Sequence, residues 1–282
     1  MARALTGALV ACAVLVGMTF CGRAFQHRLA YLPAAKMPPI GQALPGGEVV
    51  TTHTTDGLAL TNWLLPAAPA ADRGQAVLLA HGNGGNLAGR APLAREMADR
   101  GFTVLLLGYR GYGGNPGTPS QAGLLKDAIA AREALLERGF APEQIVYFGE
   151  SIGTGVVTVL AAEHPPGALV LRSPFTSLPD VGATLIPIPP LVRFIMDRNE
   201  YPVADLMATA VAASGTPVTV LSGSADDVVP ASQSATVARI ARDHGILFEE
   251  KVIDGAGHND ALWGGPVVAD AVVRAAEAIE RP

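Results

Sequence analysis

A serine between two glycines, followed later in the chain by an acidic turn and a glycine-flanked histidine, supplies the residue types of nucleophilic serine catalysis. The segment Gly149-Glu150-Ser151-Ile152-Gly153 lies between an apolar, strand-like run and an apolar, helix-like run. A tight strand-to-helix turn of this kind exposes one hydroxyl above a sheet, and its close backbone approach favours glycine on either side. We therefore predict that Ser151 is a nucleophile.

A serine hydroxyl is weakly nucleophilic at neutral pH, so it needs a base to take its proton and an acid to orient that base. A polar turn after one apolar strand contains Asp226 and Asp227, and a glycine-rich loop after the next strand contains His258. The order serine, acid, histidine is that of α/β-hydrolase triads. The predicted triad is Ser151, Asp226 and His258. Asp227 is the alternative acid, and a carboxylate in such a turn can instead bond only its own backbone.

The oxyanion that forms when a serine attacks a carbonyl is best stabilised by backbone N–H groups that already point at it. The apolar run Gln75 to Ala80 ends in the glycine-rich segment His81 to Asn86, and these two stretches predict the first strand-to-helix turn of a sheet. We predict an oxyanion hole formed by the backbone N–H groups of Asn83 and Ile152. A dinucleotide-binding loop is disfavoured because the last glycine of GxGxxG is replaced by Leu87.

Strand-like and helix-like segments alternate along the chain and would position these residues. The alternation predicts an α/β fold, with a mostly parallel sheet covered by helices on both faces. Two β-rich runs around Asp56-Gly57 predict an antiparallel hairpin before it. Ligands of such sheets bind at the carboxyl ends of the strands, where every proposed catalytic loop lies. The predicted parallel strands are residues 76–80, 102–107, 145–148, 168–172, 218–221 and 247–252.

Taken together, the segments resemble the α/β-hydrolase superfamily, and within it the BEM46, ABHD13 and ABHD17 types of serine hydrolase. Besides the segments described above, the resemblance is carried by Gly108 to Gly114, Gly117 to Ser120, Ser173 to Ser177, Gly223 to Pro230 and Gly257-His258. It implies the α/β-hydrolase fold and an esterase-like or thioesterase-like acyl hydrolase, often attached to a membrane. The expected substrate is a small-molecule or lipid-like acyl compound.

One stretch, residues 178–214, departs from the alternation at the point where such hydrolases insert a lid. It is short and rich in proline, which predicts a small helical lid. The candidates for the wall of an acyl pocket are Ile186, Ile188, Leu191, Phe194 and Ile195. The alternative is that these side chains only pack on the sheet, because an apolar run between prolines does not reveal which surface it faces.

The N-terminal segment suggests a three-part organisation: residues 1–24 as a membrane anchor or signal segment, 25–47 as a tether, and 48–282 as the hydrolase domain. Ala4 to Gly22 carries no charge and is nearly long enough to cross a bilayer. Its candidate cleavage sites are poor, and Leu9 to Cys12 only partly matches a lipobox, so we expect an uncleaved single-pass anchor. Positive charge is heavier after this segment, which favours a cytoplasmic domain, whereas the short basic start favours export. We expect an extracytoplasmic domain.

Composition limits the remaining classes of function. The 282 residues are 49% hydrophobic, which allows one large core, and the net charge of −5 disfavours nucleic acid as a partner. Both cysteines lie in the N-terminal segment, and the sequence has no HExxH motif, so we expect no metal and no organic cofactor. The sequence thus predicts a serine hydrolase that cleaves carboxylic esters or thioesters through an acyl-enzyme. The alternatives are a peptidase or lactonase on the same scaffold and a catalytically silent, membrane-tethered binding module.

Overall fold

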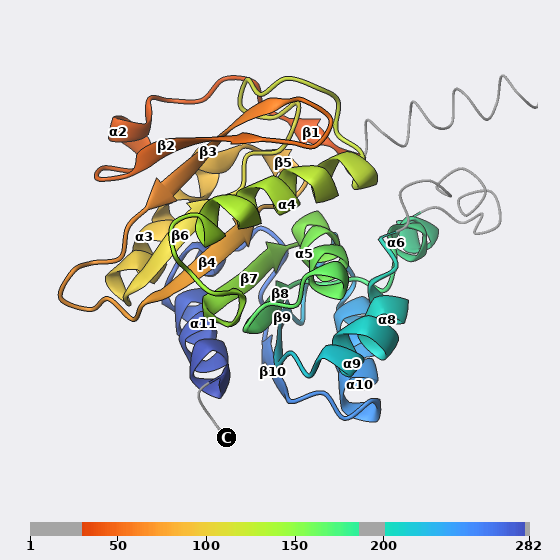
Figure 1. Ribbon diagram of the computed structural model, residues 1–282. Coiled ribbons are helices and arrows are strands. Elements are labelled where there is room, and N and C mark those ends of the chain that lie inside the picture. Colours follow the sequence, from red (N-terminus) through yellow and green to blue (C-terminus); the bar gives the residue numbers. More distant parts are fainter. Residues whose placement is uncertain (1–29, 186–200, 280–282) are drawn as a thin grey trace, which may run out of the picture.

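The computed structural model describes residues 30–185 and 201–279, which form an α/β sandwich around a twisted sheet (Figure 1). Within these residues, the main sheet has eight strands in the order β10-β9-β8-β7-β4-β6-β3-β2. β2 and β3 are antiparallel, as are β3 and β6, and every other neighbouring pair is parallel. The strands are β2 (Glu48–His53), β3 (Ala59–Leu65), β4 (Gln75–Ala80), β6 (Phe102–Leu106), β7 (Ile145–Glu150), β8 (Ala168–Arg172), β9 (Val218–Gly223) and β10 (Phe248–Ile253).

The central strands are apolar at every position because each face of the sheet is covered. In β4, the side chains of Ala76 and Leu78 join a core with α4 (Gln121–Leu136), α5 (Ile152–Glu163) and α10 (Ala231–Asp243). Those of Val77 and Leu79 join a second core with α3 (Ala91–Asp99) and α11 (Pro266–Ile279). Successive side chains of a strand point to opposite faces, so a doubly covered strand shows no alternation. Figure 1 shows the two helical layers on either side of the sheet. The predicted α/β-hydrolase fold is confirmed.

Helices and short elements fill the connections between the strands. The α-helices are α2 (Ile40–Ala43), α3 (Ala91–Asp99), α4 (Gln121–Leu136), α5 (Ile152–Glu163), α6 (Leu178–Leu185), α8 (Val203–Leu206), α9 (Ala212–Ser214), α10 (Ala231–Asp243) and α11 (Pro266–Ile279). The shorter turns of helix are η1 (Leu87–Arg90), η2 (Pro142–Gln144), η3 (Met207–Val211) and η4 (Ala261–Gly264). A separate two-stranded sheet joins β1 (Leu32–Pro33) in parallel to β5 (Gly84–Gly85).

The stretch predicted as a lid is described only in part. In its second half, α8 and η3 pack on α5 and α10, and Val203, Met207 and Val211 are buried in the core. The five proposed pocket residues, Ile186, Ile188, Leu191, Phe194 and Ile195, lie outside the described residues, and the lid stays a prediction.

The predicted membrane anchor or signal segment, residues 1–24, also lies outside the described residues. Within residues 30–185 and 201–279, none of the helices combines the length and the apolar character needed to cross a bilayer.

Candidate active site

Ser151 lies at the sharp turn between β7 and α5, where the sequence predicts a strained elbow. Its backbone has φ 53° and ψ −120°, and a non-glycine residue in the left-handed region costs about 1–3 kcal/mol unless the surroundings hold it there. The Ser151 N–H donates to the carbonyl of Arg172 at 2.9 Å, and the Ser151 carbonyl accepts from the Thr154 hydroxyl at 2.6 Å. Both sides of the strained residue are thus tied to ordered structure.

The two glycines of the elbow are required by the close packing of α5 on the sheet. A Cβ on Gly153 would lie 2.2 Å from the carbonyl oxygen of Ala80, and a Cβ on Gly149 would lie 2.6 Å from Cγ2 of Val157. Real Cβ atoms do not approach other heavy atoms this closely, so a side chain at either position would push α5 away from β4 and β7. The GxSxG spacing therefore follows from the geometry of the turn.

Asp226 and His258 are brought together from loops that follow β9 and β10. His258 Nδ1 lies 2.8 Å from Asp226 Oδ2 and 3.0 Å from Oδ1. Asp226 Oδ1 also accepts the backbone N–H of Val229 at 2.8 Å, and both members of the pair are buried. Asp227 is exposed. Bonding through Nδ1 leaves Nε2 as the nitrogen available to a nucleophile.

The charge of Asp226 is favoured by its hydrogen bonds. Burial raises the pKa of this carboxyl, but the hydrogen bond with His258 and the backbone N–H of Val229 outweigh burial and lower the pKa below its usual value. Asp226 is therefore ionised at neutral pH. An ionised carboxylate beside the imidazole stabilises the imidazolium that forms when a base takes a proton.

Ser151 lies at the same edge of the sheet as the Asp226–His258 pair but is not bonded to it. In the part of the chain that the structure describes, no hydrogen bond joins the Ser151 hydroxyl to His258. Nucleophile–base hydrogen bonds are often long without substrate and shorten in the Michaelis complex. The structure thus brings two of the three predicted residues into contact and places the third at the end of β7, two strands away from β9.

The loop predicted to supply the oxyanion hole passes directly beside the nucleophile. A Cβ on Gly82 would lie 3.5 Å from Cβ of Ser151, and Asn83 follows this close approach. Ile152 is the first residue of α5, and the first N–H groups of a helix have no partner within the helix. Both proposed donors therefore flank the serine, one on the loop after β4 and one on the elbow.

Two tyrosines, Tyr109 and Tyr112, hold this loop in place. In the sequence they appeared only within a segment that carries the family resemblance. Tyr109 Oη donates to the carbonyl of His81 at 2.9 Å, and Tyr112 Oη donates to the carbonyl of Asn83 at 2.8 Å. The ring of His81 lies 4.3 Å from that of Tyr109 between centroids. Burial lowers the pKa of His81 to about 4, so this histidine is neutral at physiological pH and supports the loop.

A second set of contacts, which was not predicted, joins the proposed oxyanion loop to residues 32–36. Strand β1 pairs with β5, and the Leu32 N–H donates to the carbonyl of Asn83 at 2.9 Å. The side-chain amide of Asn86 donates to the carbonyls of Ala34 and Lys36. The segment that follows residue 29 is therefore a structural part of the proposed oxyanion loop, although the sequence analysis assigned it to a tether.

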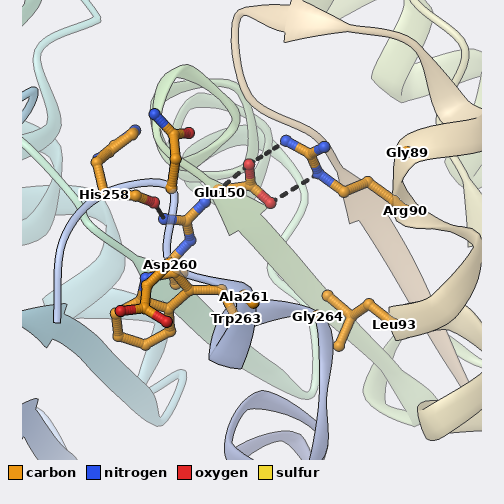
Figure 2. Close-up of a pocket in the computed structure, with 11 residues that line it drawn as sticks. Gly89, Arg90, Leu93, Glu150, His258, Asp260, Ala261, Trp263 and Gly264 are labelled. Carbon is orange, nitrogen blue, oxygen red and sulfur yellow. Dashed lines mark hydrogen bonds and ion pairs between the residues drawn. The ribbon is translucent and has the colours of Figure 1, made fainter.

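A cavity of about 220 Å³ lies next to His258 (Figure 2). Its walls come from the loop after β10, from the charged ends of β7 and β8, and from η1 and α3. The volume is below that of usual ligand pockets, and Ser151 is not among the residues that line the cavity. The lining residues are Gly89, Arg90, Leu93, Glu150, Arg172, His258, Asn259, Asp260, Ala261, Trp263 and Gly264.

Sequence reasoning missed the ionic network in this wall, in which Glu150 pairs with both Arg90 and Arg172. Burial raises the pKa of Glu150, but the two guanidinium groups outweigh it and lower the pKa below its usual value. The available signal was a charged residue at the end of each of two otherwise apolar strands. Within residues 30–185 and 201–279, no three His, Cys, Asp or Glu side chains gather as a metal ion would need.

Comparison with known proteins gives relatives over most of the chain. The family model described as serine aminopeptidase, S33 (Hydrolase_4), matches residues 71–201. An uncharacterized Mycobacterium tuberculosis protein, Rv2307c, is 44% identical over 252 residues, which is 88% of this chain and 86% of the relative. The α/β hydrolase domain-containing protein WAV2 of Arabidopsis thaliana is 33% identical, covering 73% of this chain and 72% of its own. The protein bem46 of Schizosaccharomyces pombe is 32% identical, covering 79% and 75%.

Solved structures share the fold at lower identity. An α/β hydrolase from Vibrio vulnificus superposes with a TM-score of 0.70 at 22% identity, covering 86% of this chain and 88% of its own. The Pyrococcus furiosus esterase Pf2001 superposes with a TM-score of 0.69 at 18% identity, covering 88% and 96%. At these identities, the similarity concerns the fold.

Proposed function

Since this chain belongs to the α/β-hydrolase family, together with the Bem46 and WAV2 proteins, we propose that it is a serine hydrolase that cleaves carboxylic esters or thioesters through an acyl-enzyme. The observation that carries the proposal is the buried Asp226–His258 hydrogen bond at the sheet edge where the strained Ser151 elbow lies. An acyl-transfer site needs these groups together, because the base must be oriented before it can activate a serine.

In the proposed reaction, His258 Nε2 takes the hydroxyl proton of Ser151 as the oxygen attacks the substrate carbonyl. The backbone N–H groups of Asn83 and Ile152 stabilise the resulting oxyanion. The imidazolium then gives its proton to the leaving alcohol or thiol, and the acyl-enzyme remains. Water, activated by the same imidazole, attacks the ester carbonyl, and the acid and the free serine are released. Asp226 keeps His258 in the tautomer with its proton on Nδ1.

A peptidase is the second candidate, because the family model that matches residues 71–201 is described as a serine aminopeptidase. The same triad would serve, but an aminopeptidase must also bind the free amino group of its substrate, which calls for an acidic group near Ser151. A panel of aryl esters, acyl thioesters and aminoacyl anilides separates the two. The proposal expects turnover of esters or thioesters well above that of anilides, and the reverse order would favour the aminopeptidase.

The test of the nucleophile is the substitution Ser151→Ala. We expect it to abolish hydrolysis of a short-chain aryl ester and labelling by a fluorophosphonate, with an unchanged circular dichroism spectrum, because the side chain only loses its oxygen. Mapping of the modified peptide in the unsubstituted protein should identify Ser151. Hydrolysis retained by the folded Ser151→Ala variant would reject the assignment.

For the rest of the chain, we propose that residues 1–24 form an uncleaved membrane anchor and that the hydrolase domain lies outside the cytoplasm. The length and apolar character of Ala4 to Gly22 support this proposal. An anchored hydrolase would meet acyl substrates at the membrane surface, which suits a lipid-like acyl compound.

A further inference from the structure

Arg90, Glu150 and Arg172 form a continuous chain of ion pairs in the wall of the cavity, and Figure 2 shows the pairing of Arg90 with Glu150. Arg172 Nη2 lies 2.8 Å from Glu150 Oε1, and Arg90 Nε donates to Glu150 Oε2 at 2.8 Å. The exposed fraction of the side chain falls from 24% in Arg90 to 8% in Glu150 and 3% in Arg172. Arg172, the innermost residue, is almost completely removed from water.

Stability alone gives little reason for an arginine at this position. Buried ion pairs lose so much hydration that well-packed apolar residues often replace them without loss of stability. The other residues of β8, from Ala168 to Leu171, are all apolar and buried, and an apolar residue at position 172 would continue the strand. Burial lowers the pKa of Arg172 against the opposing effect of Glu150. The specific contacts of the guanidinium therefore deserve a functional explanation.

Arg172 contacts the backbones of the proposed nucleophile and the proposed base. Its carbonyl accepts the N–H of Ser151 at 2.9 Å, and its Nη1 donates to the carbonyl of His258 at 2.6 Å. One residue thus joins two groups that lie on different loops and are not hydrogen-bonded to one another in the described part of the chain. The main chain of Arg172 makes the contact with Ser151, and its side chain makes the contact with His258.

Trp263 completes the support of the histidine loop. The guanidinium carbon of Arg172 lies 5.4 Å from the centroid of the Trp263 ring, a cation–π contact. Trp263 Nε1 donates to the carbonyl of Gly257 at 2.8 Å. Two successive carbonyls of the loop, those of Gly257 and His258, are therefore held by two side chains that contact each other, while Asp226 holds the imidazole itself.

We propose that Arg172 is a positioning residue for His258, which fixes the loop after β10 relative to Ser151 through the His258 carbonyl and the ring of Trp263. Glu150 sets the orientation of the guanidinium, and Arg90 in turn bonds the second oxygen of Glu150. The inference rests on the proposed function, because that proposal assigns His258 the role of base. Arg172 acts through His258 and takes no part in the chemistry.

The substitution Arg172→Lys tests this role, because lysine keeps the charge but lacks the planar group that can reach Glu150, the His258 carbonyl and Trp263 together. A misplacement of about 1 Å can cost about 100-fold in rate, so we expect kcat to fall by about 10- to 100-fold. We expect KM to stay within about twofold, because no substrate contact is removed. Fluorophosphonate labelling of Ser151 should slow by a similar factor.

Arg132→Lys is the matched control. Arg132 is also a buried arginine with an ion pair, to Glu133, but it lies on α4, and none of its described contacts reaches the triad. The Arg132→Lys variant should lose about as much thermal stability as Arg172→Lys. It should keep the kcat and the labelling rate of the unsubstituted protein. A folded Arg172→Lys variant that turns over and labels at the unsubstituted rate would overturn the proposal.

If Arg172→Lys does not fold, Trp263→Phe decides. Phenylalanine keeps an aromatic ring beside the guanidinium and removes the N–H that binds the Gly257 carbonyl, so kcat should fall below that of the unsubstituted protein, again with KM unchanged. An unaltered kcat in this variant rejects the positioning role. If the unsubstituted protein neither hydrolyses esters nor labels, the proposed function fails and this inference fails with it. An active protein with unaffected variants rejects the inference alone.

Discussion

At the scale of single residues, the proposed chemistry depends on which carboxylate faces the imidazole. Asp226 is buried and bonded to His258 Nδ1, and its neighbour Asp227 is exposed. Adjacent acids that are equivalent in the sequence become distinct because the turn directs one side chain inward, where backbone N–H groups receive it. The difference is local and can be tested with two isosteric substitutions.

Asp226→Asn should lower kcat by about 10⁴-fold with little change in KM, because an amide favours the wrong tautomer of His258 and cannot stabilise its cation. Asp227→Asn is the matched control and should keep kcat. Steady-state kinetics on an aryl ester at neutral pH measures both. A large loss confined to Asp227→Asn would move the role of the acid to that residue.

At the scale of elements, the proposed oxyanion loop depends on segments far from it in the sequence. The carbonyl of Asn83 accepts bonds from Leu32 and from Tyr112, so the loop is held between β1 and the segment after β6. Asn86 links the loop to the segment after β1 while its Oδ1 accepts the N–H of Ala88. A backbone donor can stabilise an oxyanion only if its direction is fixed beforehand.

Asn86→Asp should therefore weaken catalysis. Aspartate keeps the acceptor for Ala88 but turns the two donor contacts into repulsion with the carbonyls of Ala34 and Lys36. We expect kcat to fall by about 10-fold, and the free energy of unfolding to fall by about 1–3 kcal/mol, the cost of unpaired buried polar groups. Enzyme kinetics and urea denaturation measure the two effects.

Asn62→Asp provides the control for this substitution. Asn62 is buried in β3, and its amide also donates to neighbouring groups while its oxygen accepts a backbone N–H. The Asn62→Asp variant should lose stability and retain its kcat. Unchanged kcat in Asn86→Asp, at a similar loss of stability, would show that β1 does not support catalysis.

At the scale of the whole molecule, the buried His81 makes stability depend on pH. Burial lowers the pKa of His81 from 6.5 to about 4, so between these values the unfolded chain binds the proton that the folded chain excludes. Stability is therefore fully present above about pH 6.5 and is lost as the pH falls towards about 4. This loss of stability at low pH is expected of a basic group that the fold keeps uncharged.

We expect this group to lower the free energy of unfolding by about 2 kcal/mol between about pH 7 and about pH 5. His81→Gln, which cannot titrate, should show a smaller loss over the same interval. Urea denaturation of both proteins at the two pH values gives the difference. Equal losses in the two proteins would contradict the role assigned to His81.

The proposed anchor also belongs to this scale. We expect the full chain to stay with membranes after washing with salt and with alkaline carbonate, because the uncharged Ala4 to Gly22 can nearly span a bilayer. Leu9→Arg combined with Val14→Arg should release it, since each buried arginine costs about 2.5–3.5 kcal/mol in the middle of a membrane. Release of the unsubstituted protein by either wash, or an intact mass that lacks the segment, would reject the anchor.

The sequence by itself determined the sheet and the elbow, because both depend on short-range patterns. A strand buried on both faces must be apolar throughout, as Val77 to Leu79 are, and a turn that packs α5 on the sheet must have glycine at 149 and 153. The order of the loops along the chain then placed Asp226 and His258 at one edge.

Only the tertiary structure decided the rest. The pairing of β1 with the loop of Asn83, and the chain from Arg90 through Glu150 to Arg172, join residues that lie 50 or more positions apart or on separate strands. No local periodicity predicts such contacts, because their partners are chosen by where the strands and loops meet in space. The choice of Asp226 over Asp227 followed in the same way, from the side on which His258 reaches the turn.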